Sequence, residues 1–219
     1  MKNVVLVDVC SGNLRSVARA LTAAGATVTQ TRDPDIVRKA DKIVVPGQGA
    51  FGAFVRGLAA TGLGDVLTER LRAGTPYLGI CLGMQVLFES SDEDGRAQAG
   101  VVNAPLPGLG LIAGRVARLA PGPRFKIPHM GWNQVHRPTD IVRPPDAALL
   151  GIPDGAHVYF VHSYAVQPRD RKVIALTTDY GGEFCSAVRQ ANLFACQFHP
   201  EKSQAVGLAI LRNFVEDRS

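Results

Sequence analysis

The N-terminal third of the chain alternates between short apolar runs and segments whose apolar side chains recur at helical spacing. Strands are expected at residues 3–9, 27–29 and 42–45. A helical pattern follows the first run and ends at Gly25, and Asp33 with Pro34 marks the start of another helix. Parallel strands are predicted because each helix crosses one face of the sheet before the chain returns. We therefore expect an α/β fold.

Later segments extend this sheet. The apolar spacing predicts a helical stretch over residues 50–72, a strand over 75–80, a helix over 82–89 and a final strand over 193–198. Ser203 is expected to cap a last helix. Proline and glycine are frequent from about residue 100 to 188, where short strands are predicted, including 157–164 and 173–178. The expected architecture is a three-layer, mainly parallel sheet with helices on both faces and additional strands in the 100–190 region.

The composition limits the class of protein. A chain of 219 residues with 46% hydrophobic residues can bury the core of one domain, and this length leaves little room for a second. No apolar run reaches the about 18 residues of a membrane helix, and no signal-type cleavage region follows the N-terminus, so we expect a soluble, cytoplasmic protein. The net charge is +5, but the basic residues are scattered, which argues against a nucleic-acid partner.

The four cysteines show no Cys-x-x-Cys pair and no zinc-like spacing to histidine. We therefore expect no disulfide framework, no metal site and no cofactor. Cys10, at the end of the first predicted strand, is expected to be a small packed residue.

One cysteine stands between two glycines at a predicted strand-to-helix junction, in the sequence GICLG (79–83). A nucleophile elbow needs such a junction, because its turn is so sharp that larger flanking side chains would clash. The turn would expose the sulfur of Cys81, and the N–H groups that begin the next helix would favour the thiolate. The alternative is a buried cysteine packed among glycines, which is the commoner role of a free cysteine.

A cysteine nucleophile needs a base, and the candidates are the five histidines, His129, His136, His157, His162 and His199. His199 is the strongest of them, because it ends the last predicted strand. Side chains two positions apart in an extended chain point the same way, so Glu201 would orient the imidazole. On its own, such a pair is more often an exposed loop pair. Open α/β sheets place their sites at the C-terminal ends of parallel strands, and this favours a site formed by both strand ends.

Acyl transfer also needs donors for an oxyanion. The backbone N–H of Leu82, directly after the cysteine, would supply one. The glycine-rich turn PGQGAFG (46–52), with Gly47, Gln48 and Gly49, emerges from another predicted strand and would supply a second. The alternative for this cluster alone is an ordinary tight turn.

These residues resemble the class I (triad type) glutamine amidotransferases, which have a flavodoxin-like α/β fold and release ammonia from glutamine. More narrowly, motifs along nearly the whole chain are similar to the glutaminase subunits of imidazole glycerol phosphate synthase: GNLRSV (12–17), PGQGAFG (46–52), GICLGMQ (79–85), PHMGWN (128–133), YFVHSY (159–164) and FHPEKS (198–203). PHMGWN and FHPEKS are the more specific of these. Amidotransferases for anthranilate or guanylate typically have histidine at the position of Met84, and the pyridoxal phosphate glutaminase has a Gly-Gly-Glu-Ser turn that is absent here.

The resemblance implies one glutamine amidotransferase domain over residues 1–219 and a mechanism. Cys81 would attack the glutamine carboxamide, His199 would protonate the departing ammonia, and a thioester would be hydrolysed to glutamate while Glu201 holds His199. The residues implied to hold glutamine are Gly49, Gln85, Ser163 and Tyr164. The turn at Gly47 and Gln48 would present its oxyanion N–H only after a peptide rearrangement.

The resemblance also implies a partner, a separate (β/α)8 barrel cyclase. This subunit uses the ammonia to make imidazole glycerol phosphate and aminoimidazole carboxamide ribotide for histidine synthesis. Trp132, Asn133 and Lys202 fall in motifs that face the cyclase in the family. From composition alone they would be a half-buried tryptophan, a turn asparagine and a solvated lysine.

The chain departs from the family pattern at a few positions. Val9 and Cys10 follow Asp8 where Tyr-Gly is usual, Gln48 stands at the position of the oxyanion valine, and Ala113 replaces a proline. Two other classes of function stay open. A docking module that has lost catalysis predicts a damaged triad, and a stand-alone glutaminase predicts activity without any partner.

Overall fold

The computed structural model describes residues 2–9, 14–93 and 105–217, so the prediction for Cys10 lies outside the described residues. Parallel strands form one half of the main sheet: β2 (Ala26–Thr31), β1 (Lys2–Val7), β3 (Ile43–Gly47), β4 (Tyr77–Cys81) and β13 (Leu193–Cys196), in that spatial order. None of the helices in the described ranges has the length and apolar character needed to cross a membrane. The predicted parallel α/β core is confirmed.

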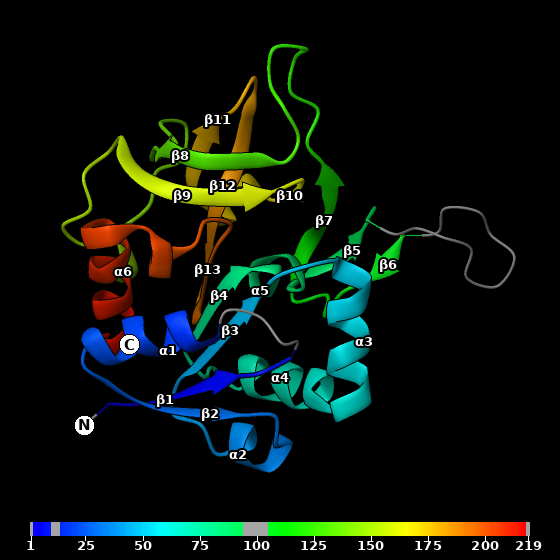
Figure 1. The fold of residues 1–219 in the computed structure, drawn as a ribbon, viewed down its shortest axis with the longest axis vertical. Helices are drawn as coiled ribbons and strands as arrows, with labels where there is room; N and C mark the ends of the chain where they lie inside the picture. The colour runs from blue at the N-terminus through cyan, green and yellow to red at the C-terminus, as the bar shows by residue number, and fades with distance from the viewer. Residues whose placement is uncertain (1, 10–13, 94–104, 218–219) are drawn as a thin grey trace, which may run out of the picture.

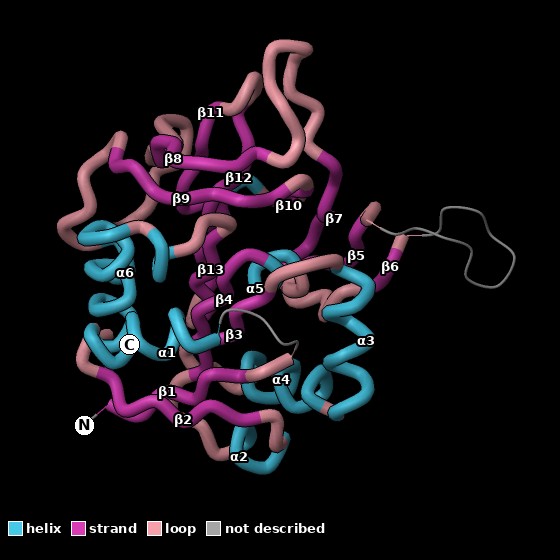
Figure 2. Tube along the Cα trace, in the orientation of Figure 1, coloured by secondary structure: helices cyan, strands magenta, loops and turns pink. Residues whose placement is uncertain are grey.

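The sheet continues beyond β13 through strands that are mostly antiparallel. They are β12 (Glu183–Gln190), β10 (Tyr164–Pro168), β7 (Ile112–Arg118), β5 (Phe88–Ser91) and β6 (Leu106–Pro107), with β11 (Ile174–Asp179) paired to β12. A separate two-stranded sheet pairs β8 (His129–Val135) with β9 (Ala156–His162). Figure 2 shows this pair near the upper end of the main sheet, where β9 packs against α6 and β8 against β11. These are the additional strands expected in the 100–190 region.

Helices cover both faces of the parallel strands (Figure 1). The helices are α1 (Leu14–Ala23), α2 (Pro34–Arg38), α3 (Phe51–Thr61), α4 (Leu63–Arg72), α5 (Leu82–Gln85) and α6 (Gln204–Glu216), with 3-10 turns η1 (Ala147–Leu149), η2 (Arg171–Val173) and η3 (Pro200–Lys202). Leu21 of α1 and Ile210 of α6 are buried in one core, whereas Phe54 of α3 and Leu67 of α4 are buried in the other. One core lies on each face of the sheet, so the fold has the three layers, helices, sheet and helices, that the sequence predicts.

The register of the parallel strands brings three strand ends together. Gly47 of β3 lies opposite Cys81 of β4, and Ile80 lies opposite Cys196 of β13. Since all three strands run the same way, the residues that follow them meet at one edge of the sheet. His199 comes three residues after Cys196 and therefore reaches the edge at which β4 ends.

The predicted helix over residues 82–89 is wrong beyond its first turn. Helix α5 ends at Gln85, and Phe88–Ser91 is strand β5, which pairs with β7 and β6. Val86, Leu87 and Phe88 are all fully buried, so the apolar run has no polar face from which its period could be read. A four-residue helix has almost no macrodipole, and the support for the thiolate expected from a long helix is lost with it.

Two other expectations needed correction. The helical stretch over residues 50–72 is divided at Gly62, whose left-handed φ of 70° ends α3 before α4 begins. Ser203 precedes α6, but its hydroxyl donates to the carbonyl of His199 (2.7 Å) and accepts from the N–H of Tyr159 (3.0 Å) instead of capping the helix. Through these two hydrogen bonds, Ser203 links strand β9 to the turn that contains His199.

Candidate active site

Cys81 lies at the junction of β4 and α5 with φ of 55° and ψ of −106°, a backbone conformation that L-residues rarely adopt. The flanking glycines are required by space. A Cβ atom on Gly79 would lie 2.5 Å from the carbonyl oxygen of Gly83, and one on Gly83 would lie 1.9 Å from the carbonyl oxygen of Val45. The geometry is that of a nucleophile elbow, in which a strained turn presents the side chain at the strand end.

Replacing Gly83 with alanine is expected to lower the free energy of unfolding by about 3 kcal/mol, because backbone atoms of β3 must move to admit the methyl group. Chemical denaturation measures this loss. Gly64→Ala in α4 is the matched control, since its added Cβ would lie 3.8 Å from its nearest neighbour, Leu58 Cβ. The control should be neutral or stabilising by up to about 1 kcal/mol, and equal effects of the two substitutions would contradict the steric argument.

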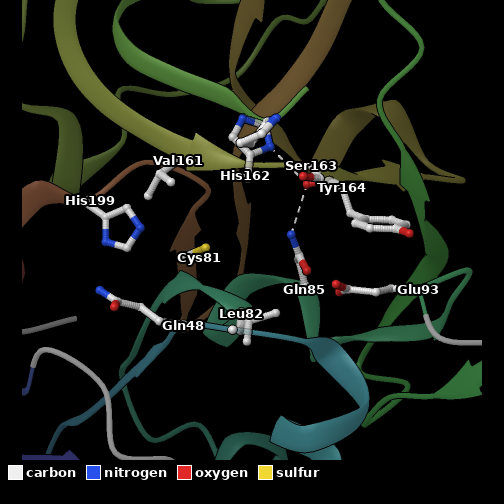
Figure 3. Close-up of a pocket in the computed structure, with 12 residues that line it drawn as sticks. Gln48, Cys81, Leu82, Gln85, Glu93, Val161, His162, Ser163, Tyr164 and His199 are labelled. Atoms are coloured by element: carbon white, nitrogen blue, oxygen red, sulfur yellow. Dashed lines mark hydrogen bonds between the residues drawn. The ribbon is translucent and has the colours of Figure 1, made fainter. Parts of the chain in front are cut away.

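Cys81 opens into a cleft of about 300 Å³. The lining residues are Gln48, Gly49, Cys81, Leu82, Gln85, Glu93, Pro128, Val161, His162, Ser163, Tyr164 and His199. The structure therefore brings Cys81 and His199 together with the residues predicted to hold glutamine (Figure 3). Gly47, which was also predicted for the oxyanion turn, does not line the cleft, but it pairs with Cys81 across the β3–β4 ladder.

His199 and Glu201 form a buried pair. The imidazole Nδ1 lies 2.9 Å from Oε1 of Glu201, and the two side chains are 2% and 1% exposed. Glu201 belongs to the 3-10 turn η3, so the extended geometry expected for this pair is wrong although the contact is made. Nε2 of His199 has no hydrogen-bond partner among the described residues, and the ring faces the cleft together with Cys81 (Figure 3).

The electrostatics of His199 suit an acid. Burial by itself lowers the pKa of His199, but its interactions with Cys81 and with Glu201 outweigh burial and raise the pKa to about 9. The imidazole is therefore protonated at neutral pH, beside a sulfur with which it shares the cleft. A cationic imidazole favours a neighbouring thiolate, as an activated cysteine nucleophile requires.

Gln85 and Glu93 are polar side chains on the side of the cleft that lies away from His199 (Figure 3). Gln85 Nε2 donates to the carbonyl of Tyr164 (3.0 Å) and to Oε1 of Gln197 (2.9 Å), whereas Gln85 Oε1 is buried without a hydrogen-bond partner in the described part of the chain. Glu93 accepts from the N–H of Phe51 (3.0 Å) and lines the same cleft. An unpartnered acceptor and a carboxylate together suit a ligand that carries N–H donors and a positive charge.

Glycine is required at two positions of the β3 turn. A Cβ on Gly47 would lie 2.5 Å from Cβ of Leu82 and 2.7 Å from the ring of Phe54. Gly49 has φ of 96°, in the region where only glycine is unstrained. The turn thus packs closely against the elbow, as a second source of oxyanion donors must. The predicted peptide rearrangement at Gln48 stays a prediction.

Sequence reasoning missed several residues of the site. Glu93, Pro128, Val161 and His162 line the cleft, and Gln197, which is fully buried, donates from Nε2 to Cys81 Sγ at 3.4 Å. His162 and Val161 lie in the motif that supplied Ser163 and Tyr164, and Gln197 lies two residues before His199. For Pro128, Val161 and His162 the available signal was their place within these motifs, whereas Glu93 and Gln197 lie outside them.

Two of the three residues predicted to face a partner, Trp132 and Lys202, contact the same tyrosine. Trp132 is 47% exposed and stacks edge-on against Tyr159, with ring centroids 6.1 Å apart, and Lys202 Nζ lies 5.6 Å from the centroid of the same Tyr159 ring. Met130, on the same strand as Trp132, is 61% exposed. Asn133 belongs to strand β8 and not to a turn, and it donates to the carbonyl of Asp179 (2.8 Å). Exposed aromatic and thioether groups of this kind are typical of interaction surfaces.

Comparison with known proteins assigns the family. The family model "Glutamine amidotransferase class-I" matches residues 5–217. The chain belongs to the class I glutamine amidotransferases. Within them it belongs to the HisH family: it is 46% identical over 216 residues to the imidazole glycerol phosphate synthase subunit HisH of Syntrophotalea carbinolica, covering 96% of this chain and 98% of that protein. It is also 46% identical over 221 residues to the HisH subunit of Geobacter sulfurreducens, covering 99% of each.

Solved structures agree with the fold of this class I amidotransferase. A crystal structure of a glutamine amidotransferase superimposes with a TM-score of 0.70 at 20% identity and covers 97% of both chains. The structure of PurLQS from Thermotoga maritima gives a TM-score of 0.68 at 17% identity and covers 98% of both chains. At these identities the likeness concerns the fold, and the resemblance inferred from the sequence motifs is confirmed by the HisH relatives.

Proposed function

We propose that this chain is the glutaminase subunit of imidazole glycerol phosphate synthase, acting in the cytoplasm as a single amidotransferase domain over residues 1–219. It hydrolyses L-glutamine to L-glutamate and ammonia, and the ammonia passes to a separate barrel cyclase that makes imidazole glycerol phosphate and aminoimidazole carboxamide ribotide in L-histidine biosynthesis. The observation that carries the proposal is the cysteine elbow that shares one cleft with His199, whose ring is held by Glu201. Membership of the HisH family supports the pathway.

The first half of the reaction is an acyl transfer to sulfur. The Cys81 thiolate adds to the side-chain carbonyl carbon of glutamine, forming a C–S bond and a tetrahedral oxyanion. His199, protonated because its pKa is about 9, then donates a proton to the nitrogen, and the C–N bond breaks to release ammonia. Glu201 keeps the ring oriented through Nδ1. The product on the enzyme is a γ-glutamyl thioester.

The second half hydrolyses the thioester. Neutral His199 takes a proton from water, the resulting hydroxide adds to the thioester carbonyl, and the C–S bond breaks to give glutamate and the thiolate. The oxyanion of each step would be held by the N–H of Leu82 and by an N–H of the turn at Gly47, Gln48 and Gly49. Leu82, Gln48 and Gly49 line the cleft beside Cys81, which supports this assignment.

The far side of the cleft would bind the amino-acid end of glutamine. Gln85 offers a buried acceptor without a partner and Glu93 offers a carboxylate, so the α-ammonium group is proposed to lie between them. Gly49, Ser163 and Tyr164 complete the proposed glutamine site. Glu93 thereby joins the residues that the motifs had suggested.

A partner subunit is part of the proposal. A cleft of about 300 Å³ suits one amino acid and leaves no room for a ribonucleotide acceptor beside it. Trp132, Asn133 and Lys202 are the proposed interface residues, and Met130 is exposed on the same strand as Trp132 and Asn133. The proposed assembly is a heterodimer with the barrel cyclase.

Glutamate release from glutamine tests the function directly. The purified chain is assayed alone, with the barrel subunit, and with the barrel subunit plus its ribonucleotide ligand, and the Cys81→Ala chain supplies the background. We expect a low rate alone and a rise of about 10²-fold or more in the ligand-bound complex, the scale on which completing a catalytic site acts. An equally high rate without the barrel would indicate a stand-alone glutaminase. No release under any condition would favour a docking module.

A further inference from the structure

A chain of buried hydrogen bonds reaches the nucleophile from behind the cleft. Gln197 lies between the end of β13 and His199, and its side chain is fully buried. Its Nε2 lies 3.4 Å from Cys81 Sγ and its Oε1 lies 2.9 Å from Gln85 Nε2. Gln197 does not line the cleft, so it contacts the nucleophile without facing the space for the substrate.

The direction of these hydrogen bonds follows from their acceptors. The backbone carbonyl of Tyr164 can only accept, so the side chain of Gln85 must direct its NH2 group toward it. The same NH2 group faces Gln197, which must therefore present its oxygen to Gln85. The NH2 group of Gln197 is then left to face the sulfur of Cys81. Both amide orientations are thus fixed by the network.

Two buried histidines continue the chain on the other side of the Tyr164 carbonyl. Nδ1 of His162 lies 2.9 Å from that carbonyl, so it carries the proton, and Nε2 of His162 must accept. Nδ1 of His129 lies 3.0 Å from this acceptor and is therefore the donor. Nε2 of His129 is left as an acceptor, and Nδ2 of Asn133 lies 3.3 Å from it.

This chain of hydrogen bonds requires both imidazole rings, His129 and His162, to be neutral. Burial lowers the pKa of His129 to about 4. Burial also lowers the pKa of His162 to about 3, against the raising effect of its hydrogen bond to Tyr164 and with a further lowering by His129 and His199. One proton per ring lets each nitrogen face a matching group, whereas a second proton on His162 would set two N–H groups against each other.

We propose that Gln197 is a positioning residue for the nucleophile: its amide N–H holds the Cys81 sulfur in the attacking orientation, and the chain through Gln85, the Tyr164 carbonyl, His162, His129 and Asn133 fixes the direction of that N–H. A thiolate accepts hydrogen bonds strongly, so one N–H both orients and stabilises it. The chain begins at Asn133, beside the exposed Trp132, and ends at the reacting atom. The proposal rests on the proposed function, which makes Cys81 the nucleophile.

Gln197→Met tests the donor, because methionine keeps nearly the same shape and removes the amide. In the complex with the barrel subunit, kcat for glutamine hydrolysis should fall about tenfold, the size expected for one hydrogen bond to a charged group, while KM changes less than about threefold. The rate of Cys81 alkylation by iodoacetamide, followed by mass spectrometry of the peptide that carries it, should fall about tenfold at pH 7.

A second variant keeps the proposal testable if Gln197→Met does not fold. His129→Phe preserves the stacking of this ring on Phe160 and Tyr180 but removes the donor to His162. We expect the rate of Cys81 alkylation at pH 7 to fall about threefold. The effect should be smaller than that of Gln197→Met because the lost His129–His162 contact reaches Gln85 only through the Tyr164 carbonyl. His157→Phe is the matched control, because His157 is exposed on β9 and lies outside the chain of hydrogen bonds.

Unchanged alkylation and kcat in a folded Gln197→Met chain would overturn the proposal and leave Gln197 as a residue that fills space. If Gln197→Met is unfolded, an alkylation rate in His129→Phe equal to that of His157→Phe would overturn it. The alkylation assay needs no substrate. A failure of the proposed function would instead be seen as wild-type chains that release no glutamate, so the two failures are distinguishable.

Discussion

Replacing Cys81 with serine is expected to reduce glutamine hydrolysis in the assembled complex by at least about 10⁴-fold, because removing the nucleophile of a catalytic unit removes nearly all that the unit contributes. The hydroxyl of serine stays protonated under conditions in which a thiolate forms, and it is a weak nucleophile without a strong base. Cys81 is also one of the groups that raise the pKa of His199, so the substitution weakens the general acid as well as the nucleophile.

The measurement is steady-state glutamate release by the serine variant in the complex. Cys185→Ser is the matched control: Cys185 is a buried free cysteine on β12 whose sulfur contacts the carbonyl of Ala187 and which lies outside the cleft. The control should keep the wild-type rate if it folds. A Cys81→Ser chain that retained more than about 1% of the wild-type rate would contradict a thioester mechanism.

Glu201→Gln is expected to lower the rate by about 10²-fold or more and to change its dependence on pH. His199 must be protonated to release ammonia, so the wild-type rate should fall as pH rises through about 9, the pKa of His199. The Glu201 carboxylate is one of the groups that raise this pKa, so removing its charge lowers the pKa. The alkaline fall in rate should therefore move to lower pH in the variant.

A pH profile of kcat/KM in the complex checks this shift, because kcat/KM reports the pKa values of the enzyme without bound glutamine. Glu183→Gln is the control, because Glu183 is exposed at the start of β12, where its carboxylate lies 3.8 Å from Arg171, and it should leave the profile unchanged. A fall in rate without any movement of the alkaline limb would mean that Glu201 only orients the ring. A limb that moved to higher pH would contradict the assigned electrostatics.

The sequence motifs located the site more accurately than they located its secondary structure. GICLG, the turn after β3 and the His-Pro-Glu sequence all lie around one cleft, because each ends a parallel strand and the register aligns those ends. Helix 82–89 was wrong because Val86, Leu87 and Phe88 are all fully buried, so the run has no period, and Phe88 begins a strand that pairs with β7. The helical spacing of apolar residues gave the wrong structure here because pairing with a distant strand determines the conformation of this segment.

The sequence did not predict those residues of the site whose position depends on tertiary contacts. Glu93 and His162 look like ordinary polar residues in the sequence, and their place in the cleft depends on how β5 and β9 lie relative to β4. Trp132 was ambiguous for the same reason, since its exposure depends on the β8–β9 pair standing apart from the main sheet. Such placements depend on contacts between segments far apart along the chain.

The sequence by itself determined the parallel α/β core, the cysteine elbow with its two obligatory glycines, and the family. These features are local, since they depend on side-chain period, on the space at a tight turn and on short motifs. Only the tertiary structure decided which atoms meet: the length of α5, the raised pKa of His199, and the chain of hydrogen bonds from Asn133 to Cys81. Burial and hydrogen-bond direction arise when distant strands pack together, and no local pattern encodes them.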